Sequence, residues 1–471
     1  MAAAAELRAS RDWVAFPVIA IAISAGVLAA LSRSPFTPWI AIGVLTAAPA
    51  LWFAFAAQRE WPIILCAAAI LLPPVPFPIG DSGAHPSILI ASAGLLGGLA
   101  RLREWRIQRS ALNASLAALI AAFALSLGFA ALYSGWSIAA ASAARLLLFG
   151  MGIYVYFTAS QGPGEVARPQ AETAARWLFG IAAAAAIFGC IDFVYQLPAP
   201  AGFGAQFVWL SSGVYRRAQG LFYDATALGN LCAFFLTMSV VAFAGRKLLP
   251  RAVSGLGIVI FLAALLLSFS RAALGAAVIA CLVLAVLERK AWATRRLALG
   301  VGALAAVTVV AFLLTLPEVA STYLARLDFG SGSVATPERF FSGRLETWRA
   351  IAAFVSEHPW QVVAGIGYKT LPYTRHLGRP LIADNMYLST LVETGVFGLA
   401  ALLALNAAVL KSSFNAAKQG SFFGRWMFCF WIGEMFQMML GDVLTFWRVL
   451  PVYFWVLAQV VHENRSGRSV R

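Results

Sequence analysis

Apolar runs of about 20 residues recur along nearly the whole chain, separated by short charged or Pro- and Gly-rich breaks. An α-helix of that length crosses the hydrocarbon core of a bilayer, which is about 30 Å thick. The runs predict helices that start near Trp13, Trp39, Trp61, Ser87, Ala111, Ile138, Trp177, Ala225, Ala252, Ala272, Leu297, Met386, Arg425 and Val443. The fourth run is short, and prolines break the end of the third. The pattern therefore predicts an all-α polytopic membrane protein with about 12–14 transmembrane helices.

The composition supports this fold class. Of 471 residues, 61% are hydrophobic and 12% are charged, whereas a soluble domain carries roughly 25% charged residues. The net charge of +15 is expected in a membrane protein, because Lys and Arg accumulate in cytoplasmic loops, and no nucleic-acid partner is predicted. The five cysteines lie inside apolar runs without a CxxC pair, so we expect neither disulfides nor metal ligands.

The loop charges predict the orientation. With the amino terminus inside, the inward loops contain Arg101, Arg103, Arg106, Arg109, Arg246, Lys247, Arg251, Arg289, Lys290, Arg295, Arg296, Lys411 and Lys418. The short outward loops around Gly80, Gly135 and Gly441 contain no Lys or Arg. Both termini are therefore predicted to be cytoplasmic.

A long segment, residues 317–383, contains no spanning run, and the helix count places it outside. Loops of this length are usually functional or disordered. The stretch that begins at Arg344 has apolar residues at helical spacing, which predicts an ordered helix along the membrane surface. The chain is thus divided into transmembrane helices (1–316), a large, partly helical outer loop (317–383) and C-terminal helices with a short tail (384–471).

The ionisable residues inside the predicted spans all lie in the outer half of the bilayer. They are Arg145, Asp192, Glu393, Glu434 and Arg448, with Arg271 at an outer corner. Such residues are costly in lipid and are candidates for function. Pairing of Arg145 or Arg448 with Asp192 or Glu434 would stabilise single charges. A water-filled cavity that opens outward explains better why all of them share one leaflet, and Arg216 and Arg217 add to its rim.

Several arginines at one membrane surface predict a site for an anionic, phosphorylated head group, because the guanidinium group binds phosphate in bidentate fashion. Arg145 and Arg216 are candidates on this ground. The sequence contains no DxD, no HExxH and no histidine pair, so no metal is predicted. It also lacks GxxxxGK[ST] and a strand-borne GxGxxG, so neither a nucleotide nor another cofactor is predicted. A lipid pyrophosphate donor, which carries its own leaving group, fits these constraints.

Four stretches between about residues 215 and 400 form a recognisable series. They are Arg217-Ala-Gln-Gly-Leu-Phe, Ser268-Phe-Ser-Arg-Ala-Ala, Arg344-Leu-Glu-Thr-Trp with the later Gly365-Ile-Gly, and Asp384-Asn-Met-Tyr-Leu-Ser-Thr-Leu-Val-Glu-Thr-Gly. In order and spacing the chain resembles the O-antigen ligase and polysaccharide polymerase family of integral-membrane glycosyltransferases.

The resemblance implies a bacterial inner-membrane enzyme of surface polysaccharide synthesis, for O-antigen (lipopolysaccharide) or exopolysaccharide. Such an enzyme transfers glycan from undecaprenyl pyrophosphate to a sugar hydroxyl at the periplasmic face, inverting and without metal. The implied partners are this donor, a glycan or lipid-core acceptor, membrane lipids and other polysaccharide assembly proteins. Carried over by position, Arg217 and Arg271 hold the pyrophosphate, joined by Arg344.

The candidate base departs from the family pattern. Ligases of the family have His-Asn after the long loop, whereas this chain has Asp384-Asn385. A carboxylate still accepts the proton of an acceptor hydroxyl, and the change favours a polymerase over a ligase. His376, eight residues upstream, is the alternative base. At a helix start Asp384 is also suited to a purely structural role as N-terminal cap.

A transporter or flippase of lipid-linked glycan is the rival hypothesis. Such a protein needs a charged path that reaches both leaflets, and the inner half of the predicted spans contains no ionisable residue. A structural scaffold for polysaccharide assembly is a third reading, and it predicts that substitutions of the arginines have no effect.

Overall fold

The computed structural model describes residues 60–74, 85–162, 168–199, 206–245, 248–288, 302–303, 305–310, 313–327 and 344–469. The spans predicted to start at Trp13, Trp39 and Leu297 begin outside these residues. The described helices are α3 (Trp61–Leu71), α4 (Pro86–Ala100), α5 (Ala111–Ser134), α6 (Trp136–Gln161), α7 (Arg168–Tyr195), α8 (Ala225–Gly245), α9 (Arg251–Leu267), α10 (Arg271–Leu287), α12 (Pro317–Leu327), α14 (Arg344–Glu357), α15 (Pro359–Ala364), α16 (Met386–Lys418), α17 (Phe422–Met438) and α18 (Leu450–Ser469). Short 3-10 turns are η1 (Leu102–Glu104), η2 (Gly220–Phe222) and η3 (Val443–Thr445), and β1 (Phe207–Leu210) pairs antiparallel with β2 (Gly213–Arg216).

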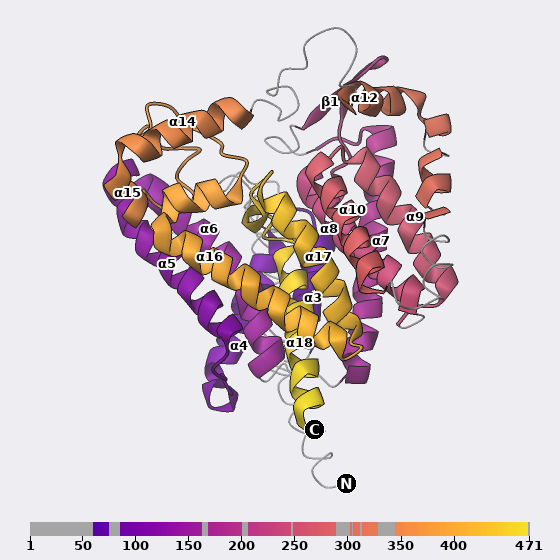
Figure 1. The fold of residues 1–471 in the computed structure, drawn as a ribbon, viewed down its shortest axis with the longest axis horizontal. Helices are drawn as coiled ribbons and strands as arrows, with labels where there is room; N and C mark the ends of the chain where they lie inside the picture. Colours follow the sequence, from indigo (N-terminus) through magenta and orange to yellow (C-terminus); the bar gives the residue numbers. More distant parts are fainter. Residues whose placement is uncertain are drawn as a thin grey trace, which may run out of the picture.

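These helices form an all-α polytopic membrane fold, as predicted (Figure 1). Among the described residues, five helices are long and apolar enough to cross a membrane, namely α5, α6, α7, α8 and α16. Shorter apolar helices, including α3, α4, α9 and α10, pack with them. The predicted starts coincide with the observed ones for α3, α5, α8 and α16.

The last helix begins later than predicted. Residues 443–445 form η3, and α18 begins at Leu450, so Arg448 lies in the turn before the helix and not within it. Pro451 sits in the first turn of α18, where a missing backbone N–H costs nothing. The proline therefore allows the helix to start there.

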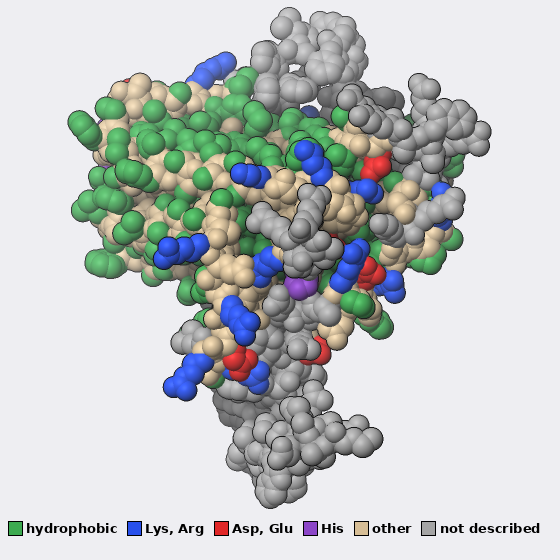
Figure 2. Space-filling model, turned by 60° about the horizontal axis from the view of Figure 1, so that its bottom comes forward, with side chains coloured by type: hydrophobic (Ala, Val, Ile, Leu, Met, Phe, Trp, Pro, Cys, Tyr) green, Lys and Arg blue, Asp and Glu red, His purple; other side chains and the backbone are tan. Residues whose placement is uncertain are grey.

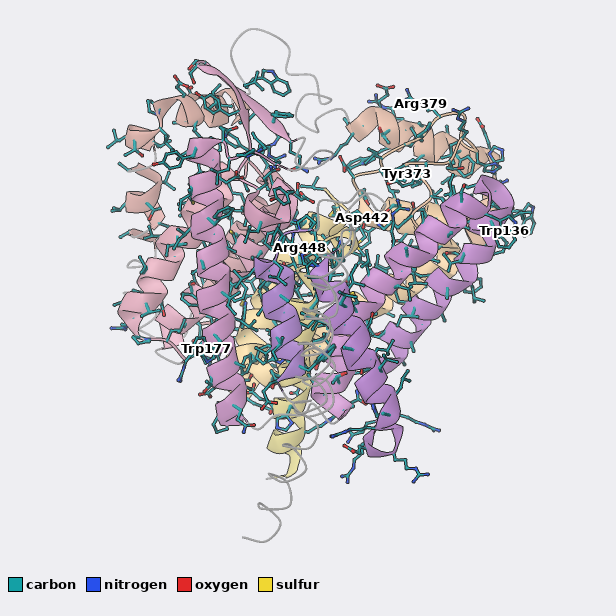
Figure 3. All side chains as sticks on the ribbon, turned by 180° about the vertical axis from the view of Figure 1, so that it is seen from behind. Trp136, Trp177, Tyr373, Arg379, Asp442 and Arg448 are labelled. Carbon is teal, nitrogen blue, oxygen red and sulfur yellow. The ribbon has the colours of Figure 1, made fainter. Side chains whose placement is uncertain are left out.

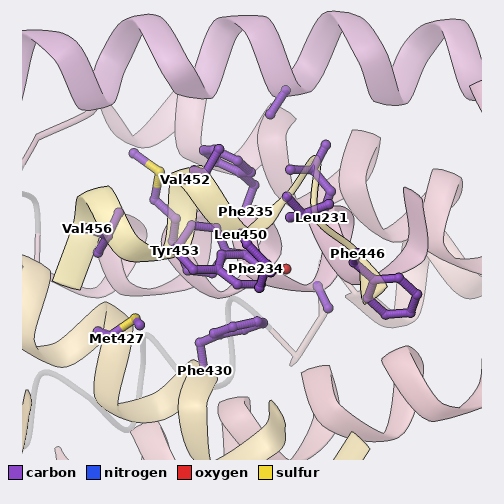
Figure 4. Packing of buried hydrophobic residues seen from close by; sticks show 14 of the residues in the cluster. Leu231, Phe234, Phe235, Met427, Phe430, Phe446, Leu450, Val452, Tyr453 and Val456 are labelled. Atoms are coloured by element: carbon purple, nitrogen blue, oxygen red, sulfur yellow. The ribbon is translucent and has the colours of Figure 1, made fainter. Parts of the chain in front are cut away.

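The centre of the bundle is aromatic. Phe234 of α8 lies between α17 and α18, with ring centroids 4.4 Å from Trp426, 4.7 Å from Phe430 and 4.4 Å from Tyr453 (Figure 4). All four side chains are buried. Because lipid is as apolar as a protein core, such helices are held by close packing and interhelical hydrogen bonds. One such bond joins Asn230 of α8 to the Glu434 carboxylate of α17, at 2.8 Å.

Figure 1 shows α12, α14 and α15 of the long loop at one end of the bundle, called here the loop end, and the carboxyl terminus at the opposite end. Figure 2 is turned toward that opposite end, and Lys and Arg side chains are scattered over it while hydrophobic side chains cover the neighbouring surface. The helix predicted from Arg344 onward is confirmed as α14.

The long loop does more than cover the surface, because part of it enters the bundle. Residues 365–371 are buried, and the Tyr368 ring stacks on Phe123 of α5 with centroids 4.3 Å apart. The backbone N–H groups of Ile366 and Gly367 donate to the carbonyls of Val392 (3.0 Å) and Glu393 (2.8 Å) in α16.

This contact depends on a kink in α16. Gly395 has φ +74°, which interrupts the helix and leaves nearby carbonyls for the loop to satisfy. A Cβ atom on Gly395 would lie 2.2 Å from the carbonyl oxygen of Val363, and one on Gly365 would lie 2.4 Å from that of Glu393. The two glycines therefore permit the loop backbone to touch the helix backbone, and the loop is fixed against α16 at this point.

Candidate functional site

A cavity of about 430 Å³ opens at the loop end, between the long loop and the helices beneath it. Its walls come from α6, the start of α8, residues 368–373 and 382–384 of the loop, the first turns of α16, and the segment before α18. The polar and charged residues that line it are Arg145, Gln206, Asp224, Thr226, Arg344, Lys369, Asp384, Ser389, Glu393, Asp442 and Thr445.

The loop side of the cavity holds Arg344 and Asp384. Arg344 Nε donates to Asp384 Oδ2 at 3.1 Å, which joins the first residue of α14 to the end of the loop. Trp348 of α14 also donates to the carbonyl of Ala383 at 2.7 Å. The Asp384 side chain is 44% exposed, so its carboxylate remains accessible from the cavity.

Asp384 does not cap α16. The cap is Asn385, whose side-chain oxygen accepts from the backbone N–H groups of Tyr387 (3.0 Å) and Leu388 (3.1 Å). Asp384 precedes it with φ +43°, a left-handed conformation that is uncommon for residues other than Gly and Asn. The capping role considered for Asp384 is therefore wrong, and its carboxylate is left to face the cavity.

Lys369 is the second cavity residue in a left-handed conformation, with φ +56°. Its ammonium group forms an ion pair with the carboxylate of Asp442, in the segment before α18. Burial lowers the pKa of Lys369 to about 8, while the nearby Glu393 carboxylate opposes this change and Arg145 adds to it. Glu393 Oε1 accepts the backbone N–H of Leu371 at 3.1 Å, which ties the loop to α16 again.

Arg145 reaches the cavity from α6. Its guanidinium carbon lies 4.3 Å from the ring centroid of Tyr373, a cation–π arrangement. Tyr373 itself lines the cavity and is 40% exposed. Arg145 thus lies in a cavity, as the depth of the charged residues predicted.

Arg217 and Arg271 share a neighbouring corner, where α9 ends and α10 begins. Arg217 Nε donates to the carbonyl of Ser268 at 2.7 Å, and Arg271 is the first residue of α10. Neither lines the cavity, but the backbone N–H of Arg217 donates at 3.0 Å to the carbonyl of Gln206, which does. The corner is therefore adjacent to the cavity wall.

Arg216 has a different environment from its neighbour Arg217. Its Nη2 lies 2.7 Å from Asp192 Oδ1 and also contacts the carbonyl of Leu197. β2 ends at Arg216, so Arg217 already belongs to the segment after the strand, where its side chain bonds to Ser268. Arg216 does not line the cavity, and the pairing of Asp192 with Arg145 or Arg448 is wrong.

Arg448 holds the bundle together at the loop end. It donates to the carbonyls of Ala69 (2.8 Å) and Leu72 (2.7 Å) at the end of α3 and to that of Leu221 (2.7 Å) in η2. Figure 3 labels Arg448 close to the middle of the bundle. The carbonyls left at the Pro-rich end of α3 are thus satisfied by a side chain.

His376 lies outside the cavity, on the surface of the loop. Its Nε2 is 3.0 Å from Gln361 Oε1, and its ring packs on Tyr133 with centroids 4.8 Å apart. Of the predicted site residues, the cavity thus brings together Arg145, Arg344 and Asp384. It adds Lys369, Asp442 and Tyr373, which sequence reasoning missed, although Asp442 is conspicuous as an acidic residue in an outward loop without Lys or Arg.

Residues 256–403 match the sequence model of a family described as O-antigen ligase, which confirms the resemblance. The match covers α9, α10, the long loop and the first half of α16, and it includes Arg271, Arg344 and Asp384. No curated protein matches the chain.

Proposed function

The chain carries a domain of the O-antigen ligase family, and from this we propose that it is a membrane glycosyltransferase. The proposed reaction transfers glycan from an undecaprenyl-pyrophosphate donor to a sugar hydroxyl, at the periplasmic face of a bacterial inner membrane, in surface polysaccharide synthesis. The observation that supports it best is the cavity at the loop end, where Asp384 and Arg344 meet within the matched segment.

In the proposed mechanism Asp384 is the general base. Its carboxylate accepts the proton of the acceptor hydroxyl while the hydroxyl oxygen attacks the anomeric carbon of the donor sugar. The new glycosidic C–O bond forms as the bond to the pyrophosphate oxygen breaks, and undecaprenyl pyrophosphate leaves with the electron pair. Attack from the side opposite the leaving group inverts the anomeric centre.

Arginines stabilise the leaving group in this mechanism. Arg217 and Arg271 lie at the corner next to the cavity wall, where a lipid pyrophosphate can reach them while its sugar occupies the cavity. Their guanidinium groups offset the negative charge that develops on the departing oxygen. Arg344 orients Asp384 through the 3.1 Å contact and adds positive charge to the cavity.

Purified protein in lipid nanodiscs is expected to release undecaprenyl pyrophosphate from an undecaprenyl-pyrophosphate-linked glycan. An equal amount of a longer or acceptor-linked glycan should form at the same time. Mass spectrometry of both products measures this. An absence of transfer with donors from the native host would contradict the proposal. In a deletion strain, accumulation of single lipid-linked repeat units would identify a polymerase, and long chains left on the lipid would identify a ligase.

The proposed orientation has its own test. Ser356 of α14 and Gln419 at the far end of α16 are both exposed, at opposite ends of the bundle. In a variant whose five cysteines are replaced by serine, Ser356→Cys is expected to react with a membrane-impermeant maleimide in intact spheroplasts. Gln419→Cys should react only after lysis, and the reverse pattern would overturn the orientation and the periplasmic site together.

A further inference from the structure

We propose that Tyr373, Lys369 and Asp442 form a binding subsite for a neutral sugar ring of the glycan. This inference rests on the proposed function and specifies which part of the cavity holds sugar and which chemistry it accepts. It is supported by the charges of the cavity, by a buried carboxylate oxygen and by an exposed aromatic ring.

The charged side chains that line the cavity do not favour an anionic ligand. Among the described residues that line it, three cations (Arg145, Arg344 and Lys369) face four carboxyl groups (Asp224, Asp384, Glu393 and Asp442). Positive charge is not in excess whether or not Glu393 is protonated. Two of the cations are already ion-paired, Arg344 with Asp384 and Lys369 with Asp442. A neutral ligand with many hydroxyl groups fits this balance better than an acidic one.

Asp442 supplies an unused acceptor. Its Oδ2 accepts the ammonium group of Lys369, whereas its Oδ1 is buried and has no hydrogen-bond partner among the residues that the structure describes. A buried carboxylate oxygen without a partner is costly, and a ligand hydroxyl that donates to it removes that cost. The ammonium group of Lys369 has three N–H donors, so it can serve the Asp442 carboxylate and a sugar oxygen together.

Tyr373 supplies an apolar surface. The side chain is 40% exposed and lines the same cavity, with the Arg145 guanidinium 4.3 Å from its ring centroid. The C–H face of a sugar ring packs well on an aromatic ring, and Tyr adds a hydroxyl group at its edge. Figure 3 shows Tyr373 nearer the loop helices and Asp442 nearer the middle of the bundle, and both line the same cavity. A sugar between them lies in the cavity that also contains Asp384, next to the proposed base.

Binding to the purified, full-length protein in nanodiscs tests the subsite without transfer. The probes are oligosaccharides released from the surface polysaccharide of the native host, separated by charge into neutral and acidic fractions, and inorganic pyrophosphate. Equilibrium dialysis is expected to show binding of the neutral fraction. Asp442→Asn and Tyr373→Leu should each weaken it by about tenfold and leave pyrophosphate binding unchanged. Because Tyr373 is exposed, its variant keeps the test valid if Asp442→Asn fails to fold.

Matched controls lie outside the cavity. Glu346→Gln alters an exposed, ion-paired carboxylate of the same loop, and Tyr195→Leu removes an exposed tyrosine of α7. Both should bind the neutral fraction normally. Normal binding by both cavity variants, or binding of the acidic fraction alone, would overturn the subsite. If the neutral oligosaccharides bind as expected but the protein transfers no glycan, the result counts against the proposed function and not against the subsite.

Competition assigns the sugar to donor or acceptor. The subsite binds the donor sugar if the lipid-linked donor displaces the neutral oligosaccharide from the wild-type protein. In that case the Asp442→Asn variant should need a higher donor concentration for the same displacement. If donor and oligosaccharide bind together, it binds the acceptor. Either result supports a neutral-sugar subsite.

Discussion

Asp384→Asn is expected to slow glycan transfer by roughly 10²- to 10⁴-fold, the usual range for loss of a general base. An amide has nearly the shape of the carboxylate but accepts no proton near neutral pH. Since Asn385 is the cap of α16, the substitution leaves the helix start unchanged. The variant should therefore insert and bind donor normally, and transfer by purified protein measures the loss.

Glu346→Gln is the control for this experiment. It makes the same chemical change at an exposed carboxylate that is paired with Arg379 at 2.9 Å, on the same loop and outside the cavity. It should retain wild-type activity. If Asp384→Asn retains most of its activity, Asp384 is not the base, and His376→Ala becomes the next substitution to measure.

Arg217→Lys and Arg271→Lys are each expected to reduce transfer by roughly 10²-fold, although both keep a positive charge. Lysine offers a single ammonium group, whereas arginine binds two phosphate oxygens at once through its planar fork. Arg217 also loses the Nε bond to the carbonyl of Ser268, so its thermal stability must be compared with that of the wild type. Rates with purified lipid-linked donor give the effect.

Arg379→Lys provides the comparison, because Arg379 is an exposed arginine of the same loop (Figure 3) and should tolerate the change. Near-normal rates from both corner variants at normal protein level would reject the bidentate role of Arg217 and Arg271. A loss confined to Arg217→Lys with reduced stability would point to its bond with Ser268 as the cause.

The helices were predictable because apolar length and charged breaks determine where a chain can cross lipid. Residues Trp61, Ala111, Ala225 and Met386 begin helices where the pattern placed them. The depth of Arg145 along its span was sufficient to predict that it lines a cavity. Arg344 and Asp384 were found from their motifs, which lie at the two ends of residues 344–384.

The remaining site residues depend on contacts that a pattern along the chain does not contain. Lys369 and Asp442 are 73 residues apart and meet only because the loop enters the bundle. That entry requires the kink at Gly395. The apolar pattern around Gly395 predicts an uninterrupted helix, so it gives no sign of the kink. Arg216 pairs with Asp192 whereas Arg217 bonds to the carbonyl of Ser268, and the short β1–β2 hairpin that ends between them has no clear sequence signal.

The contact between the loop and α16 also sets an order for biogenesis. The carbonyls that accept from Ile366 and Gly367 belong to Val392 and Glu393, 26 residues later in the chain. During synthesis the loop is therefore made before its docking site exists, and it can settle into the bundle only after the first turns of α16 have left the ribosome. The cavity is completed later still, because Asp442 follows the rest of α16 and the whole of α17. A nascent chain that ends before residue 442 thus already has membrane-spanning helices but not yet a complete cavity.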